Sequence, residues 1–231
     1  MKVSLIIPTR DESGVIGSVL KEVPRNIIDE IIVIDGHSTD NTVKEAKAEL
    51  RAGKDKFILQ EKKGFGNALL QAFKIAKGDV VVIMNADGSH NPKDIPALLK
   101  KIGQGYEYVM ASRYIKEGRS DDDTIVRFIG NRTLTFLTNL LHKTNVTDSL
   151  HFFTAITNKD LKKLHLISPG FELCIEILIR AHKAGLKFAE IPVVERPRFA
   201  GKSKVNALSA GWKILMVIFT EKLIGSRIPS M

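Results

Sequence analysis

A polar cluster follows the most apolar stretch of this chain and includes an acid suited to binding a cation. Residues 80–84 are Val-rich and lead into Asn85-Ala86-Asp87-Gly88. Such a run is typical of a strand buried on both faces, and residues i and i+2 of a strand point to the same side. We therefore expect Asn85 and Asp87 to face one ligand. An acid beside a phosphate suggests a shared divalent cation, although Asp-Gly alone could equally be a turn that closes a strand.

Similar polar clusters follow other predicted strands. They occupy residues 8–12, 35–40, 85–90 and 112–113. The carboxyl ends of parallel strands share one edge of a sheet, and ligands bind in the crevice beyond that edge. The acids of the first two clusters suit hydrogen bonds to a base and a ribose. Several such clusters at one edge predict a site for a polar ligand.

Gly64-Phe65-Gly66 precedes a predicted helix at residues 68–76. Backbone N–H groups at a helix N-terminus favour anions. The stretch lacks the complete Gly-x-Gly-x-x-Gly fingerprint, because Leu69 stands at its last position. A plain turn is the simpler interpretation of this segment.

Strand and helix patterns alternate through the first half of the chain. This alternation predicts an α/β fold with a mostly parallel sheet and helices on both faces. Expected strands cover residues 3–7, 29–35, 57–60, 80–84, 106–111, 152–157 and 187–194. Expected helices cover residues 13–23, 42–51, 68–76, 91–102, 125–142, 171–184 and 206–225. We predict one domain at residues 1–205, with a C-terminal amphipathic helix at 206–231.

The formal charge of the 231-residue chain is +9, which favours anionic partners such as nucleotide diphosphates, nucleic acid or an anionic membrane. Nucleic acid is set aside, because the lysines are scattered and only 6% of residues are aromatic. Cys174 is the single cysteine, which excludes an intramolecular disulfide. Without a signal-like or membrane-spanning stretch, we expect a cytoplasmic protein.

Five motifs together resemble the family 2 glycosyltransferases of the GT-A fold, and within them the dolichyl-phosphate mannose synthase branch. The resemblance runs from Met1 to about Lys204. The motifs are Ile7-Pro8-Thr9-Arg10-Asp11-Glu12, Asp35-Gly36-His37-Ser38-Thr39-Asp40, Asn85-Ala86-Asp87-Gly88-Ser89-His90-Asn91-Pro92, Ser112-Arg113-Tyr114 and Arg198-Phe199-Ala200-Gly201-Lys202-Ser203-Lys204.

This resemblance implies an enzyme that moves a sugar, of the mannose or glucose class, from a nucleotide diphosphate to a polyprenyl phosphate with inversion. It implies Mg²⁺ or Mn²⁺ held by Asn85, Asp87 and Ser89, and catalytic roles for Asp87, Arg113, Arg127 and Arg198. The implied nucleotide-sugar site comprises Pro8, Arg10, Glu12, Asp35, Asn85, Ala86, Asp87, Ser89, Arg113, Arg198 and Lys204. An acceptor phosphate has a second pKa of about 6, so it needs charge neutralisation by arginine rather than a general base.

Three positions depart from the family pattern. Asn85 stands where the usual Asp-x-Asp begins, which removes one charge from the cation site. Arg10 replaces a usual Tyr beside the nucleotide, and residues 147–154 lack the expected Ser, Gly and basic residue. Two alternatives therefore stay open: a nucleotide-sugar-binding pseudoenzyme, or a transferase with a saccharide acceptor and Asp148 as its base.

The C-terminal helix carries the basic residue Lys222 and apolar residues that include Trp212 and Phe219. Basic amphipathic helices lie at membrane interfaces, so peripheral attachment at the inner face of the membrane is one interpretation. Packing on the core or on a second subunit is the other. The sequence does not distinguish GDP-mannose from a UDP-sugar as the donor.

Overall fold

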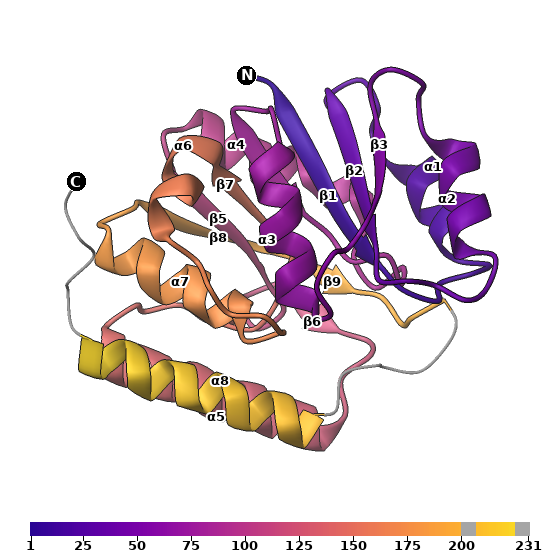
Figure 1. The fold of residues 1–231 in the computed structure, drawn as a ribbon. Coiled ribbons are helices and arrows are strands. Elements are labelled where there is room, and N and C mark those ends of the chain that lie inside the picture. The colour runs from indigo at the N-terminus through magenta and orange to yellow at the C-terminus, as the bar shows by residue number, and fades with distance from the viewer. Residues whose placement is uncertain (200–206, 225–231) are drawn as a thin grey trace.

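The structure, a computed structural model, describes residues 1–199 and 207–224. Its main sheet has seven strands in the order β3-β2-β1-β4-β7-β5-β8, and a second small sheet pairs β6 with β9 (Figure 1). The strands are β1 (Val3–Thr9), β2 (Glu30–Asp35), β3 (Lys56–Leu59), β4 (Val80–Ile83), β5 (Tyr108–Ser112), β6 (Arg119–Ser120), β7 (Thr154–Thr157), β8 (Phe188–Pro192) and β9 (Val194–Glu195).

The helices connect and cover these strands. They are α1 (Ile16–Glu22), α2 (Thr42–Glu49), α3 (Phe65–Ile75), α4 (Ile95–Gly103), α5 (Ile125–His142), α6 (Asn158–Leu161), α7 (Leu173–Lys183) and α8 (Ala207–Ile224). Two short 3₁₀ turns, η1 (Pro92–Asp94) and η2 (Lys162–Leu164), flank α4 and α6 respectively.

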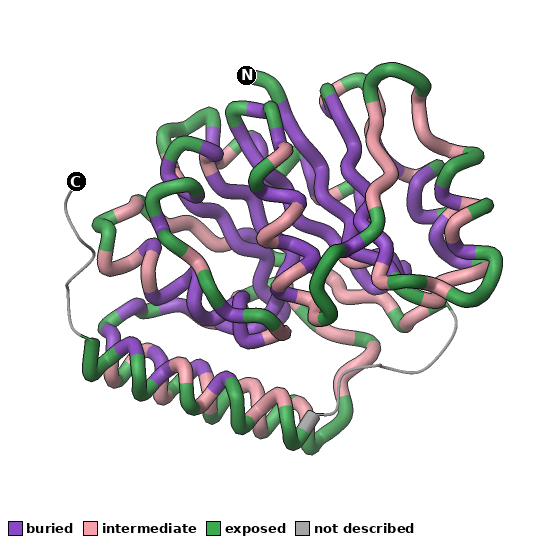
Figure 2. Tube along the Cα trace, in the orientation of Figure 1, coloured by how far each residue is buried: buried purple, intermediate pink, exposed green. Residues whose placement is uncertain are grey.

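The central strand β4 shows why a continuous apolar run is needed in the middle of the sheet. All four of its residues are buried. Val81 and Ile83 pack into the core cluster that contains side chains of α3 and α7. Val80 and Val82 pack into the opposite cluster, which contains side chains of α1 and α4. Alternate residues of a strand face opposite sides, so this strand belongs to both cores. The strands at the centre of the sheet are drawn in the purple of buried residues in Figure 2.

The mostly parallel α/β sheet with helices on both faces is confirmed. One strand runs against the others, because β7 pairs antiparallel with both β4 and β5. The expected strand at residues 187–194 is divided in two, since β8 joins the main sheet and β9 pairs with β6. The division places residues 194–195 beside the loop that follows β5.

Two long helices, α5 and α8, lie side by side along the lower edge of the molecule in Figure 1. Charged contacts hold α8 to the body: Glu221 accepts hydrogen bonds from Arg180 at 2.8 Å and from Lys183 at 2.7 Å. His142 of α5 is within hydrogen-bonding distance, 2.9 Å, of the Ile218 carbonyl oxygen. Among the helices that the structure describes, none is long and apolar enough to cross a membrane. The domain at residues 1–205, with a C-terminal helix at 206–231 that is part of the same domain or a contact to a membrane or second subunit, stays a prediction.

Candidate active site

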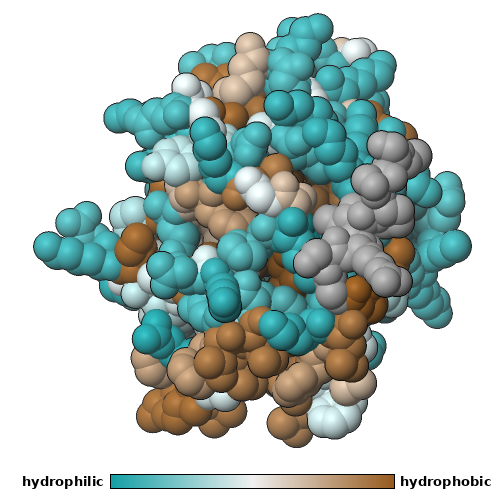
Figure 3. Space-filling view, turned by 90° about the vertical axis from the view of Figure 1, so that its left-hand side faces the viewer, coloured by the Kyte–Doolittle hydropathy of each residue, from teal (hydrophilic) through white to brown (hydrophobic). Residues whose placement is uncertain are grey.

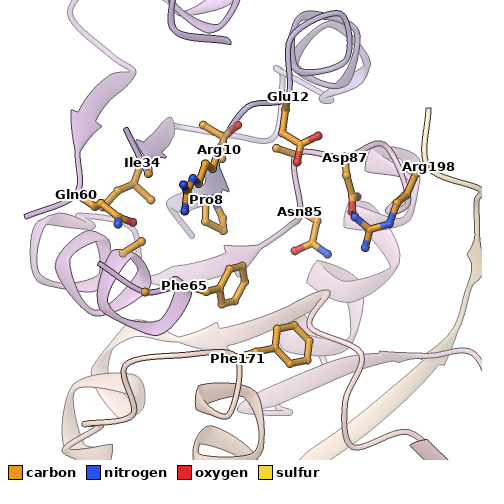
Figure 4. Close-up of a pocket in the computed structure, with 15 residues that line it drawn as sticks. Pro8, Arg10, Glu12, Ile34, Gln60, Phe65, Asn85, Asp87, Phe171 and Arg198 are labelled. Carbon is orange, nitrogen blue, oxygen red and sulfur yellow. The ribbon is translucent and has the colours of Figure 1, made fainter. Parts of the chain in front are cut away.

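The carboxyl ends of β1, β2 and β4 meet at one edge of the sheet. Thr9 at the end of β1 is registered with Asp35 at the end of β2, and Ile6 is registered with Ile83 of β4. This register brings the polar segments after the three strands together, as the sequence predicts. They surround a cavity of about 270 Å³, which we call the strand-end pocket (Figure 4).

The strand-end pocket contains most of the predicted nucleotide-sugar residues and several others. Glu12 and Arg10 project from the segment after β1, while Asn85 and Asp87 project from the segment after β4 (Figure 4). The predicted lining residues are Pro8, Arg10, Glu12, Asn85, Ala86, Asp87 and Arg198. Sequence reasoning missed Gln60, Phe65 and Phe171, which line the pocket from the segment after β3, from α3 and from the segment before α7.

Asp35 supports the pocket from behind. Its side chain is fully buried, and its two carboxylate oxygens accept hydrogen bonds from the Ser38 hydroxyl at 2.5 Å and the Ser38 N–H at 2.9 Å. The Ser38 hydroxyl in turn accepts a hydrogen bond from the Asp11 N–H at 2.8 Å. Asp35 therefore joins the segments that follow β1 and β2, and it is buried where the sequence led us to expect a ligand contact.

Asp87 is buried and bonded on both oxygens. Its Oδ1 accepts hydrogen bonds from the Ser89 hydroxyl at 2.6 Å and the Ser89 N–H at 3.1 Å. Its Oδ2 lies 2.9 Å from Nη1 of Arg198. Burial alone would raise the pKa of Asp87, but these hydrogen bonds and the positive charge of Arg198 hold it below the ordinary value. The carboxylate is therefore ionised at neutral pH.

His90 fixes the backbone of Asn85. The Asn85 N–H donates to Nδ1 of His90 at 3.1 Å, and the His90 ring stacks on Phe153. Burial, with Arg113 and Arg198 nearby, lowers the pKa of His90 to about 4, so the ring is neutral at pH 7. His90 is therefore a hydrogen-bonded turn histidine that supports Asn85.

His90, His151 and Glu195 bring nitrogen and carboxylate oxygen atoms within 4.8 Å of one another, which is a possible cation cluster. Two of the three are already engaged. The lone pair of His90 Nδ1 accepts the Asn85 N–H, so in the neutral ring Nε2 carries the proton. Glu195 accepts hydrogen bonds from Arg113 and from the Ser120 hydroxyl. The oxygen atoms of Asn85, Asp87 and Ser89 are better suited to a hard cation.

Arg113 is buried beside the strand-end pocket and neutralised by two acids. Its Nε lies 2.7 Å from Asp148 Oδ2, its Nη2 lies 3.1 Å from Asp148 Oδ1, and its Nη1 lies 3.2 Å from Glu195. Burial would lower the pKa of the guanidinium, but these carboxylates raise it above its ordinary value. Both oxygens of the fully buried Asp148 bind Arg113, so in this structure Asp148 neutralises the arginine.

Arg127 and Arg198 converge on Asp122. Nη1 of Arg127, on the first turns of α5, lies 3.2 Å from an Asp122 oxygen, and Nε of Arg198 lies 3.6 Å from the same oxygen. Asp122 belongs to the polar loop that precedes α5. It is the second of three consecutive acids at residues 121–123, and the sequence alone does not distinguish it from a solvated loop residue.

A second cavity of about 490 Å³ lies between α5 and α8, and we call it the helix-side pocket. Its polar lining includes Ser89, Arg113, Arg127 and Arg198 together with the acids Asp122, Asp123 and Glu195. Its apolar lining includes Val126 and Leu134 of α5 and Leu208, Trp212 and Leu215 of α8. Asn85, Phe171 and Arg198 line both cavities, so the two pockets adjoin. Lys204, the remaining predicted site residue, lies outside the described residues.

Comparison with known proteins agrees with this architecture. The glucosyl-3-phosphoglycerate synthase of Mycobacterium tuberculosis, solved with Mn²⁺, UDP-glucose and phosphoglyceric acid, superposes with a TM-score of 0.76. It is 21% identical, and the match covers 96% of this chain and 79% of that one. The shared fold is the GT-A fold. The glycosyl transferase family 2 matches residues 4–165, and the chain belongs to this family of enzymes.

Two relatives are similar over most of the chain. The dolichol-phosphate mannosyltransferase of Pyrococcus furiosus is 31% identical over 212 residues, covering 89% of this chain and 60% of that protein. The UDP-N-acetylglucosamine–dolichyl-phosphate N-acetylglucosaminyltransferase of Methanococcus voltae is 32% identical over 210 residues, covering 82% of this chain and 83% of that protein.

Proposed function

We propose that this family 2 glycosyltransferase transfers a sugar from a nucleotide diphosphate to a polyprenyl phosphate. The meeting of two unlike pockets carries the proposal. The strand-end pocket carries charged and amide side chains at the carboxyl ends of the strands, and the helix-side pocket combines arginines with apolar side chains of α5 and α8. The two named relatives, whose names include dolichol-phosphate or dolichyl-phosphate transfer, support the same acceptor class.

The donor nucleotide occupies the strand-end pocket in this proposal. The carboxylate of Glu12 and the amide of Gln60 provide hydrogen-bonding groups for a ribose and a base, and the Phe65 ring provides an apolar contact. Arg10 adds a positive charge at the mouth of the pocket. The sugar then lies toward Asn85 and Arg198, which line both cavities.

Asn85, Asp87 and Ser89 would hold Mg²⁺ or Mn²⁺. Their side chains offer one carboxylate, one amide oxygen and one hydroxyl, and hard divalent cations prefer such oxygen ligands together with phosphate oxygens. The buried, ionised Asp87 fits this role. When bound, the cation supplies charge neutralisation for the diphosphate leaving group. Structures of the glucosyl-3-phosphoglycerate synthase of Mycobacterium tuberculosis solved with UDP and Mn²⁺ or Mg²⁺ support this cofactor.

The acceptor phosphate would lie in the helix-side pocket near Arg127 and Arg198. A phosphate monoester is ionised near neutral pH, because its second pKa is about 6. Its oxygen attacks the anomeric carbon from the face opposite the departing diphosphate, with inversion, and no proton has to be removed first. The engagement of Asp148 with Arg113 is consistent with chemistry that uses no base at that position.

A lipid acceptor also requires contact with a membrane, and we propose that the chain binds peripherally rather than by insertion. The sugar and the nucleotide base of the donor are left to experiment. Both GDP-mannose and UDP-sugars suit a pocket whose polar side chains include two carboxylates, two amides and two guanidinium groups.

The test is transfer of a radiolabelled sugar from GDP-mannose, UDP-glucose and UDP-N-acetylglucosamine, each with Mn²⁺ and a polyprenyl phosphate in detergent. We expect one donor to yield an organic-extractable product. Arg127→Gln should lower the rate at least tenfold, whereas Arg119→Gln, whose side chain pairs with Asp121 on the surface, should not. Donor binding without any lipid-linked product would instead indicate a nucleotide-sugar-binding protein.

A further inference from the structure

The described lining of the helix-side pocket has no excess of positive charge, although its proposed ligand is an anion. The lining includes three arginines, and it also includes the three acids Asp122, Asp123 and Glu195. Its two histidines, His90 and His151, are neutral at pH 7, because burial lowers the pKa of each ring. An entering phosphate therefore meets a formally neutral lining, and one of the acids has to release its arginine contacts.

Two of the three acids have partners that hold them in place. Glu195 accepts a hydrogen bond from Nη1 of Arg113 at 3.2 Å and another from the Ser120 hydroxyl. Asp123 accepts a hydrogen bond from the Tyr114 hydroxyl at 2.5 Å. These contacts fix both acids, so neither is the acid that an entering phosphate would displace.

Asp122 is the acid that contacts both arginines of the proposed phosphate site. Its Oδ2 lies 3.2 Å from Nη1 of Arg127 and 3.6 Å from Nε of Arg198. The second distance is too long for a hydrogen bond, and Nε of Arg198 is buried without a hydrogen-bond partner among the described residues. One carboxylate oxygen is thus shared by two guanidinium groups. A phosphate monoester has three acceptor oxygens and can give a separate one to each arginine.

The segment that contains Asp122 is held without the help of its carboxylate. The preceding residue, Asp121, donates its N–H to the Glu195 carbonyl oxygen at 2.9 Å. On the other side, the Thr124 hydroxyl caps α5 by accepting the Arg127 N–H at 3.3 Å. The Asp122 side chain is itself 25% exposed, and ion pairs that water reaches contribute little to stability. The carboxylate can therefore leave the arginines while the backbone stays in place.

The apolar part of the lining provides contacts that a free phosphate ion cannot use. Much of it comes from α5 and α8, whose apolar side chains gather along the lower edge of the molecule in Figure 3, where Figure 1 places these helices. Binding energy from the non-reacting part of a substrate can offset the cost of a rearrangement at the reacting end. An acceptor with an apolar chain can thus displace Asp122 at concentrations at which inorganic phosphate does not.

We propose that the Asp122 carboxylate occupies the position of the acceptor phosphate between Arg127 and Arg198, and that it determines which anions enter. A phosphate with an apolar chain displaces it, and free anions do not. The identity of the acceptor rests on the proposed function, whereas the competition between Asp122 and an entering anion does not. Asp122 contacts no reacting atom in this scheme, and its role is to set the affinity of the site.

Calorimetric titration of the full-length protein with phenyl phosphate tests the competition directly. Asp122→Asn preserves the size of the side chain and removes its charge, so the dissociation constant of phenyl phosphate should fall about tenfold. Asp121→Asn is the matched control, because it makes the same change one residue away, where the side chain pairs with Arg119 on the surface. It should stay within about twofold of the parent. A fall of less than threefold in Asp122→Asn, or weaker binding, would overturn the proposal.

The same titration in an Arg127→Gln background tests where the anion binds. Asp122 and the phosphate are proposed to compete for this arginine, so the two substitutions should not be additive. Without Arg127, the further change Asp122→Asn should improve phenyl phosphate binding by less than about threefold. A larger improvement would mean that the anion and Asp122 do not share a position.

Transfer assays separate this inference from the proposed function. In Asp122→Asn the KM for the polyprenyl phosphate should fall, and inorganic phosphate should inhibit at about tenfold lower concentration than in the parent. Equal inhibition of both proteins would contradict the exclusion of free anions. Tighter phenyl phosphate binding by Asp122→Asn, with no transfer to any acceptor by the parent, would reject the proposed function and leave the competition standing. Transfer by the parent, with anion binding unchanged in Asp122→Asn, would reject the role of Asp122 alone.

Discussion

The guanidinium of Arg198 lies 2.9 Å from Oδ2 of Asp87, the carboxylate that the proposed cation would use. Asp87 is the only acid of the predicted ligand set, because Asn85 and Ser89 carry no charge. Arg198 therefore neutralises the whole formal charge of this set. The guanidinium of Arg198 and a metal ion would both bind the Asp87 carboxylate, so they should compete for it.

Removal of Arg198 should strengthen cation binding in the absence of donor. For Arg198→Gln we predict that the Mn²⁺ dissociation constant falls about tenfold, equivalent to about 1.4 kcal/mol. The same variant should bind the donor more weakly, because a positive charge near the diphosphate is lost. Electron paramagnetic resonance of free Mn²⁺ measures the first effect, and calorimetry with the donor measures the second.

Arg196→Gln provides the control for this comparison. Arg196 is two residues away and binds Glu22 and Asn91 instead of Asp87. It should leave Mn²⁺ affinity within about twofold of the parent. Weaker Mn²⁺ binding in Arg198→Gln than in the parent would show that the arginine supports the cation site rather than competing for it.

Asn85→Asp should also strengthen the cation site, for a different reason. The change adds a carboxylate to a site that has one, and charge count is a main determinant of divalent cation affinity. We predict an increase of about tenfold in Mn²⁺ affinity, measured by the same titration. Asn41→Asp makes the same change in charge at an exposed position before α2 and should have no effect. Equal affinities for all three proteins would exclude Asn85 as a ligand position.

The glycines between α5 and α8 allow the acceptor route to be blocked without a clash in the core. Gly130→Leu places a side chain where the structure shows open space in the helix-side pocket. We predict a rise of at least tenfold in KM for the polyprenyl phosphate, with unchanged donor affinity. Gly103→Leu, at another open helical glycine in α4, should behave as the parent. A loss of donor affinity in Gly130→Leu would mean that the two pockets are not separate.

The buried pair of Arg113 and Asp148 should be important for folding. Removing one partner of a buried ion pair typically costs about 3–5 kcal/mol. Replacement of Asp148 removes both of its contacts to Arg113 and leaves the contact to Glu195 at 3.2 Å, so we expect a cost at the lower end of this range. Asp148→Asn should therefore lower the free energy of unfolding by about 3 kcal/mol in urea titrations. Asp121→Asn changes an exposed acid in the loop before α5 and should change the free energy of unfolding by less than about 0.5 kcal/mol. A stable Asp148→Asn protein with abolished transfer would instead assign Asp148 a role in the reaction.

Local patterns in the sequence predicted the parts of the site that follow strands. Asp87 and Asn85 could be placed because a Val-rich run ends beside them, and because parallel strands put their carboxyl ends on one edge. The position of Asp35 was also predictable, but its orientation was not, since its burial depends on hydrogen bonds to Ser38 three residues later.

Contacts between distant segments could not be predicted from the sequence. Phe171 and Gln60 complete the strand-end pocket from elements that carry no motif, and the antiparallel direction of β7 has no local signal. The pairing of Arg113 with Asp148 joins residues 35 positions apart. Side-chain partners of this kind follow from strand order, which short-range patterns do not specify.

The most direct test of the central claim compares three acceptors in one assay with the donor that binds. They are a polyprenyl phosphate, the corresponding polyprenol, which lacks the phosphate, and 3-phosphoglycerate, which lacks the lipid. The helix-side pocket is lined by both arginines and apolar side chains, so transfer should require both the phosphate and the lipid of the acceptor. We predict labelled product with the polyprenyl phosphate at a rate at least a hundredfold above the other two. Comparable or faster transfer to the polyprenol or to 3-phosphoglycerate would contradict a polyprenyl phosphate as the acceptor.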